Sequence, residues 1–169
     1  MNVGHVTWGL CLGATMIFST IAVAAGDKIP ELQARFDRES NPLHRAHLLE
    51  KLGNAQFDET RRAFKANDMV TVGIVLEKYR DNARVALEGL RRKHADAERD
   101  GRGYRQLEIH VRRGIREVDE ILLMAPEQYQ PPLRIVRNDL DAMDTELIHL
   151  LFRYRSAEPP SSMPPEAKP

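Results

Sequence analysis

Apolar side chains recur every three or four residues along most of the chain, the spacing that places them on one face of an α-helix. Four long segments carry this pattern, over residues 42–66, 68–99, 104–125 and 133–154, and a short one covers residues 30–40. No segment shows the strict alternation of a half-buried strand, so we expect an all-α protein. The positions predicted to face the core are Ala46, Leu49, Gly53, Phe57, Thr60 and Phe64; Val72, Val75, Tyr79, Ala83, Ala86 and Leu90; Tyr104, Leu107, Val111, Gly114, Val118 and Ile121; and Leu133, Val136, Leu140, Met143, Leu147, Leu150 and Tyr154.

Residues typical of helix ends separate these segments. Asn41-Pro42 reads as an N-cap followed by proline at the first helical position, and Asp68 can cap the next helix. Glycines at 101 and 103 and a proline at 126 mark two further breaks. Short connections make consecutive helices antiparallel, so we expect an antiparallel bundle of four long helices plus a short N-terminal helix. The 3-4 spacing of the last segment is typical of coiled-coil packing.

The first 25 residues have the layout of an export signal. Residues 6–25 contain no charged side chain, and Ala22-Val23-Ala24 gives the small-residue ending of a cleavage site. The segment before them carries only His5 where Lys or Arg is usual, which leaves an uncleaved anchor as the alternative, because about 20 apolar residues can span a bilayer. We expect a signal peptide at 1–25 and a periplasmic or secreted protein; the alternative is N-terminal anchoring in the inner membrane.

The positions of the cysteine and the prolines indicate where the folded domain begins and ends. The single cysteine, Cys11, lies inside the export segment, so a cleaved protein has no disulfide and no thiolate metal site. Residues 156–169 hold five of the ten prolines and no apolar period, which predicts a disordered tail. The helical bundle is therefore expected over residues 26–155.

Charge is balanced, with 25 basic and 25 acidic side chains, all of them after residue 25. A nucleic-acid-binding protein would show a basic excess, so we expect no nucleic-acid partner. Basic clusters at 61–62, 91–93 and 112–116 lie within a turn or two of acidic residues, which indicates ion pairs on solvated helix faces. An anion-binding face is the alternative, if arginines of different helices converge.

Two histidine motifs are weak candidates for metal binding. Glu146 and His149 form the Glu-x-x-His pair of ferritin-like bundles, but the sequence offers one copy where such sites need two. His44 and His47 share a helix face, without an identifiable third ligand. We therefore predict no metal site and no cofactor, and we expect the isolated His94 and His110 at the surface.

Two glycines, Gly53 and Gly114, stand in the middle of predicted core faces. Glycine inside a helix costs about 1 kcal/mol relative to alanine, so its presence there needs a reason. Either the helices approach closely at these points or a flat ligand fits between them. We favour close packing.

The end of the last helix is unusually apolar. Leu147 and Leu150 suffice for the packing face, while Ile148, Leu151 and Phe152 widen the apolar sector. Either the second helix, over residues 42–66, or the short first helix, over residues 30–40, covers these three side chains, or they form a patch for a protein partner or for self-association. They are the predicted partner-binding residues.

The hairpin over residues 41–79 and the helix pair over residues 104–152 resemble small exported helical proteins of environmental Gram-negative bacteria, an uncharacterised group. The resemblance implies export and a helical fold, and it carries no activity. No nucleophile constellation, phosphate loop or metalloprotease motif is present in the sequence. We expect a non-enzymatic interaction or structural protein; the alternative is a periplasmic bundle that binds a metal or a small ligand.

Overall fold

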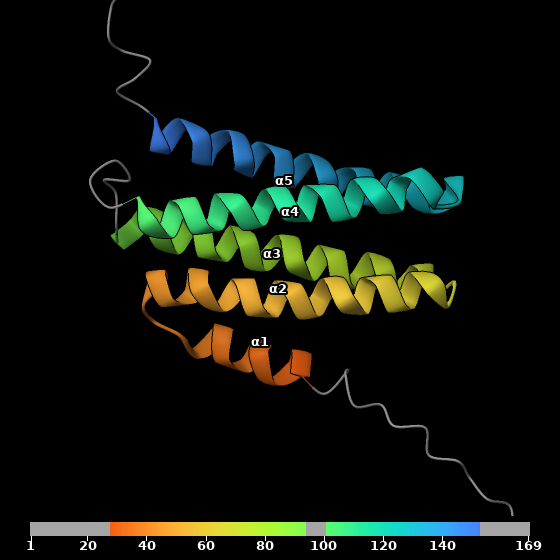
Figure 1. Cartoon of the computed structure of the whole chain (residues 1–169), viewed down its shortest axis with the longest axis horizontal. Helices are drawn as coiled ribbons and strands as arrows, with labels where there is room; N and C mark the ends of the chain where they lie inside the picture. The colour runs from red at the N-terminus through yellow and green to blue at the C-terminus, as the bar shows by residue number, and fades with distance from the viewer. Residues whose placement is uncertain (1–27, 94–100, 153–169) are drawn as a thin grey trace, which may run out of the picture.

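The computed structural model describes residues 28–93 and 101–152, and this part of the chain is helical with no strand (Figure 1). The predicted all-α class is confirmed. The export segment at 1–25, the tail at 156–169, His94 and Tyr154 lie outside the described residues. Among the described helices, none combines the length and the hydropathy that a membrane-spanning segment needs. The elements are α1 (Lys28–Arg38), α2 (Pro42–Lys65), α3 (Met69–Lys93), α4 (Arg102–Met124), the 3-10 turn η1 (Glu127–Tyr129) and α5 (Gln130–Leu151).

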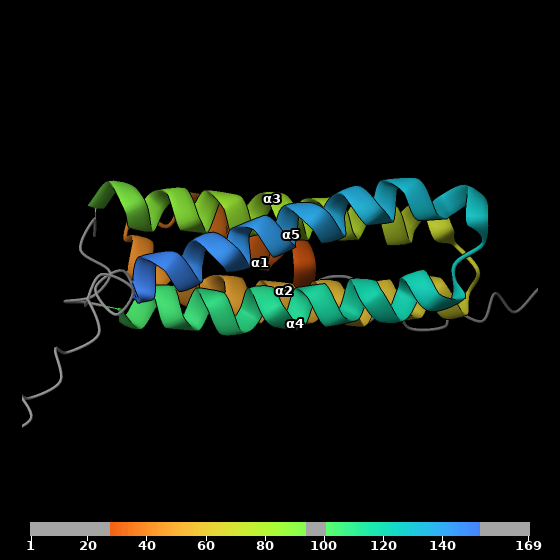
Figure 2. The same ribbon diagram turned by 90° about the horizontal axis from the view of Figure 1, so that it is seen from above.

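The four long helices form two antiparallel hairpins that pack side by side (Figure 2). α2 packs most extensively against α3, and α4 packs most extensively against α5. Between the hairpins, α2 lies beside α4 and α3 lies beside α5, each pair running in the same direction (Figures 1 and 2). The short α1 packs on the outer side of α2, antiparallel to it. The predicted bundle of four long helices with a short one in front is therefore confirmed.

The helix ends follow from local side-chain chemistry. The Asn41 side chain accepts hydrogen bonds from the backbone N–H groups of Leu43 (2.9 Å) and His44 (3.4 Å), and the Asp68 carboxylate accepts one from Thr71 (3.0 Å). Asn67 adopts a left-handed conformation (φ 58°), which asparagine tolerates better than most residues. Both predicted N-caps are confirmed.

α5 begins earlier than the sequence suggested. Pro131 and Pro132 occupy its first turn instead of preceding the helix. The first N–H groups of a helix have no acceptor within it, so proline costs nothing there and its fixed φ suits the helix.

The core contains nearly all of the predicted positions. In the described helices every one of them is buried except Phe64, Val75 and Leu150, which are partly buried. Further apolar residues beside the predicted stripes are also buried, because each long helix contacts two neighbours and so buries a wider face. They include Leu52, Leu76 and Leu87.

α1 is fixed to the bundle by its inner face. Phe36 is only 1% exposed, and the Arg45 guanidinium of α2 lies over its ring at 5.8 Å from the centroid. The Gln33 and Asn82 amides donate to each other's carbonyl oxygens, at 3.1 and 2.9 Å, which ties α1 to α3. Arg45 also donates to the backbone oxygen of Glu39, just beyond α1. These contacts fix the position of α1 beside α2.

Candidate functional site

A buried polar cluster joins α2, α3 and α4 at the centre of the bundle. His110 was expected at the surface, and this expectation is wrong: its side chain packs in the core and the residue is 5% exposed. The one proton of the Tyr79 hydroxyl is shared between two acceptors, the His110 backbone oxygen (2.9 Å) and His110 Nδ1 (3.0 Å), while His110 Nε2 lies 3.1 Å from the Glu50 backbone oxygen. A carbonyl can only accept, so Nε2 carries the proton and Nδ1 is the acceptor that faces the tyrosine.

Burial keeps both groups of this cluster neutral. Burial lowers the pKa of the His110 imidazole, and it raises the pKa of the Tyr79 hydroxyl well above its usual value. The Phe57 ring packs 4.6 Å from the tyrosine ring and 5.6 Å from the imidazole, centroid to centroid. The Arg113 guanidinium lies over the outer side of Phe57, 5.7 Å from its centroid. The cluster is therefore shielded from solvent, and its hydrogen bonds join α2, α3 and α4.

The two core glycines make room for this cluster. A Cβ added at Gly53 would lie 2.5 Å from His110 Cε1 and 2.9 Å from Tyr79 Cε2. A Cβ added at Gly114 would lie 2.9 Å from Tyr79 Cζ and closer still to Cε1. The flat groups between the helices are thus the protein's own tyrosine and imidazole rings, which explains both glycines by close packing.

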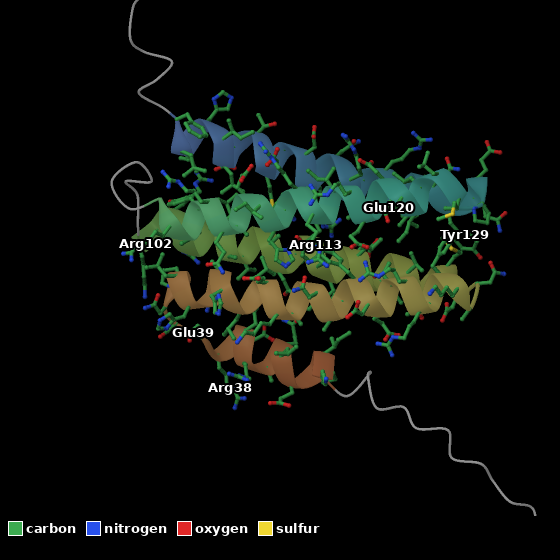
Figure 3. All side chains as sticks on the ribbon, viewed as in Figure 1. Arg38, Glu39, Arg102, Arg113, Glu120 and Tyr129 are labelled. Atoms are coloured by element: carbon green, nitrogen blue, oxygen red, sulfur yellow. The ribbon has the colours of Figure 1, made fainter. Side chains whose placement is uncertain are left out.

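An open groove runs between the end of α1 and the start of α2. Its volume is about 490 Å³. Arg38 lies at the end of α1 and Glu39 at the connection to α2, as the labels in Figure 3 show. The lining residues are Arg35, Arg38, Glu39 and Ser40 on one side and His44, His47, Leu48 and Lys51 on the other.

The groove has an excess of positive charge. Arg35 and Lys51 make no ion pair or hydrogen bond with any described residue, and Arg38 donates only to the Ala34 backbone oxygen of its own helix (3.0 Å). Glu39 is the one carboxylate among the lining residues. It accepts a hydrogen bond from the Asn41 backbone N–H (2.8 Å). Three permanent cations thus share an open surface with a single anion, a combination that attracts anionic groups.

The structure brings together the two histidines that the sequence singled out. His44 and His47 both line the groove, and His44 Nδ1 lies 4.0 Å from a Glu39 carboxylate oxygen. The Gln106 amide of α4 donates to His47 Nδ1 (2.9 Å), which places the histidine proton on Nε2. Among the described residues, no group of three or more His, Cys, Asp or Glu side chains could hold a metal ion.

The other candidate for metal binding, the pair Glu146 and His149, does not form a metal site in the structure. Glu146 pairs with Arg91 of α3, with an N–O distance of 3.0 Å, and His149 is exposed. The same pairing holds for the basic clusters: Arg61 contacts Glu117 (2.5 Å) and Arg112 contacts Asp144 (3.2 Å) across helix boundaries. The interpretation of these clusters as ion pairs is therefore confirmed for Arg61, Arg62, Arg91, Arg112 and Arg113, whereas Arg92, Lys93 and Arg116 make no ion pair with a described residue.

The predicted partner-binding residues are covered to different degrees. Ile148 and Leu151 are half-buried, and Leu151 packs against the core, while Phe152 is 48% exposed. α5 packs chiefly against α4 and α3, so neither α1 nor α2 supplies the main cover. The sequence analysis did not single out the other exposed apolar side chains, which are scattered over α3, α4 and α5: Val70, Ile74, Val85, Ile109, Leu123, Met124 and Ile135.

Comparison with known proteins adds no family to this description. No family model, no curated protein and no solved structure matches the chain. Function is therefore inferred from the chemistry of the described residues. The groove between α1 and α2 is one place among the described residues where charged and polar side chains from two helices meet at the surface.

Proposed function

We propose that this chain is an exported, non-enzymatic helical protein that acts by binding, and that the α1–α2 groove is its binding site. The observation that carries the proposal is the set of cations in the groove without a partner in the described part of the molecule, above all Arg35 and Lys51. Several arginines elsewhere on the bundle, including Arg61, Arg84 and Arg112, are engaged in ion pairs between helices. Cations left unpaired in a concave surface are suited to an external ligand.

Export is supported by the uncharged run over residues 6–25 and its Ala-x-Ala ending. The proposed location is the periplasm or the extracellular medium. Mass spectrometry of the protein isolated from its host should find a chain that begins near Ala25 or Gly26. Intact Met1 in a membrane fraction would contradict this location and favour the N-terminal anchor.

Binding is favoured over catalysis by where the acid–base groups lie. A general acid or base has to come within hydrogen-bond distance of its substrate. Tyr79 is 0% exposed and His110 is 5% exposed, and the surrounding rings leave no room beside them. The groove also exposes the acid–base groups of Glu39, His44 and His47, but three permanent cations stand beside them, which suits the groove to attracting an anionic ligand and holding it.

A metal ion is a less suitable ligand for the same groove. His44 and His47 are surrounded by Arg35, Arg38 and Lys51, and these positive charges oppose the binding of a divalent cation. Metal analysis of the purified protein tests this alternative. A stoichiometric metal that survives dialysis and is lost in His44→Ala would favour the metal-binding bundle.

Site-specific photo-crosslinking in the producing cell tests the binding proposal. A photoreactive residue replaces Lys51 in the groove, and as a control it replaces Lys78, an exposed lysine of α3. Lys78 also makes no ion pair with any described residue, so the two replacements remove the same charge from comparable helix positions. Adducts from position 51 in excess of those from position 78 are expected. Equal yields from the two positions would contradict the proposal that the groove is the binding site.

A further inference from the structure

We infer that the α1–α2 groove recognises a phosphate group; this inference rests on the proposed function and names the chemistry of its ligand. The donors come from both walls of the groove. Arg35 and Arg38 stand three residues apart on α1, a spacing that places them on the same side of the helix. Lys51 and His47 line the opposite wall on α2.

These side chains are the donor types that phosphate recognition uses. A guanidinium presents a planar fork of N–H groups that matches two phosphate oxygens, and an ammonium adds a compact point charge. His47 contributes an N–H donor, because Gln106 occupies its Nδ1 and leaves the proton on Nε2. Each wall thus offers charge together with directional hydrogen bonds.

The charge balance favours a doubly charged anion over a carboxylate. Arg35, Arg38 and Lys51 give three positive charges against the one negative charge of Glu39 in the lining, and the Glu50 carboxylate lies beside it, 3.8 Å from His47 Nδ1. The Glu39 carboxylate accepts from the Asn41 backbone, at the connection between the helices. Lys93 of α3 donates to the Ser40 backbone oxygen (3.2 Å) and brings a further cation to the same connection. A phosphate monoester compensates this excess better than a single carboxylate does.

The groove is also larger than one anion requires. Its volume of about 490 Å³ falls in the range of small-molecule sites, roughly 300–1,000 Å³. It is open along one side, and Leu48 supplies an apolar surface in the lining. A phosphate attached to a larger body, which projects from the groove, is therefore the class of ligand that fits.

The test is an NMR titration of the ¹⁵N-labelled protein with inorganic phosphate, against sodium chloride at the same ionic strength. We expect saturable shifts of backbone and side-chain signals over residues 35–51, and no comparable shifts elsewhere. Lys51→Ala should weaken phosphate binding by roughly fivefold, the effect of one exposed charge pair. The matched control Lys78→Ala, which removes one exposed lysine from another long helix, should leave the affinity unchanged.

A second arm distinguishes a free phosphate compound from a lipid headgroup. Vesicles of phosphatidylcholine that contain phosphatidic acid are compared with vesicles of phosphatidylcholine alone. Binding of inorganic phosphate with no preference for the phosphatidic acid vesicles identifies a free phosphate compound. Binding only to those vesicles, lost in Lys51→Ala and retained in Lys78→Ala, identifies the lipid. Both results support phosphate recognition.

Three results would overturn the inference: equal shifts with chloride, equal losses in the two lysine variants, or no response to either phosphate source. The last result combined with groove-specific crosslinks would leave the proposed function standing and reject phosphate as its chemistry. Without such crosslinks, the proposed function fails as well.

Discussion

Replacing Gly114 by alanine tests the packing at the centre of the bundle. The added methyl group would lie 2.9 Å from the Tyr79 Cζ and hydroxyl oxygen atoms, and closer still to Cε1. The ring cannot move away, because Gly53 faces its other edge and Phe57 packs 4.6 Å from it, centroid to centroid. Any displacement also breaks the 2.9 Å hydrogen bond from Tyr79 to the His110 backbone oxygen.

The competing effects have known sizes. Alanine gains about 1 kcal/mol over glycine as a helix former, while overpacking a core costs about 1–3 kcal/mol. A buried hydroxyl that loses its partner costs about 1–3 kcal/mol more. Gly114→Ala should therefore lower the free energy of unfolding by about 1–5 kcal/mol.

Urea denaturation followed by circular dichroism measures this change, and Gly73→Ala is the matched control. Gly73 also lies inside a long helix, but nothing is within 4 Å of its added Cβ. Alanine should therefore stabilise the protein at this position by about 0.5–1 kcal/mol. If Gly114→Ala stabilises the protein as Gly73→Ala does, the packing of Tyr79 between the two glycines is refuted.

Three further predictions concern the core, its buried histidine and the end of α5. Leu140 is fully buried, so Leu140→Ala should cost about 2–5 kcal/mol in thermal or urea unfolding, and a change near zero would contradict its place in the core. Burial lowers the pKa of His110 in the folded protein below about 6.5, its value in the unfolded chain. The stability that the neutral imidazole contributes is therefore complete above about pH 6.5, and it is lost as the pH falls toward and through the lower pKa of the folded protein. The free energy of unfolding should fall more steeply between about pH 7.5 and about pH 5 in the native protein than in His110→Gln, and parallel profiles would contradict the buried neutral imidazole. Phe152 is half exposed, so Phe152→Asp should change the unfolding free energy by less than about 1 kcal/mol, whereas loss of the folded state would place Phe152 in the core.

The helices could be predicted from sequence because their signals are local. The spacing of apolar residues gives each helix its buried face, and Asn41 and Asp68 mark two helix starts by the bonds they accept. The order of the helices in space has no such local signal. That α2 lies beside α4, and α3 beside α5, depends on how the two hairpins pack.

The buried polar cluster was missed for a related reason. His110 lies three residues after Leu107 and four before Gly114, so it shares the inner face of α4. A polar residue at such a position is easily assigned to the surface, because its partners, Tyr79 and the Glu50 backbone, are distant in sequence. The two glycines were the available signal, since they mark the place where bulky rings from other helices enter.

The candidate site could be predicted only in part. The sequence indicated that His44 and His47 share a helix face, and both line the groove. Arg35 and Arg38 carry no motif, and their importance comes from α1 folding back along α2. That arrangement depends on the burial of Phe36 and the amide pair between Gln33 and Asn82.

Hydrogen exchange measured by mass spectrometry tests most directly whether the α1–α2 groove is the functional surface. The purified protein is compared alone and in the presence of an envelope extract from the producing cell. Slower exchange over residues 35–51, absent in Lys51→Ala and retained in Lys78→Ala, is the predicted result. Slower exchange over residues 147–152 instead, with residues 35–51 unchanged, would contradict the account and transfer the binding site to the end of α5.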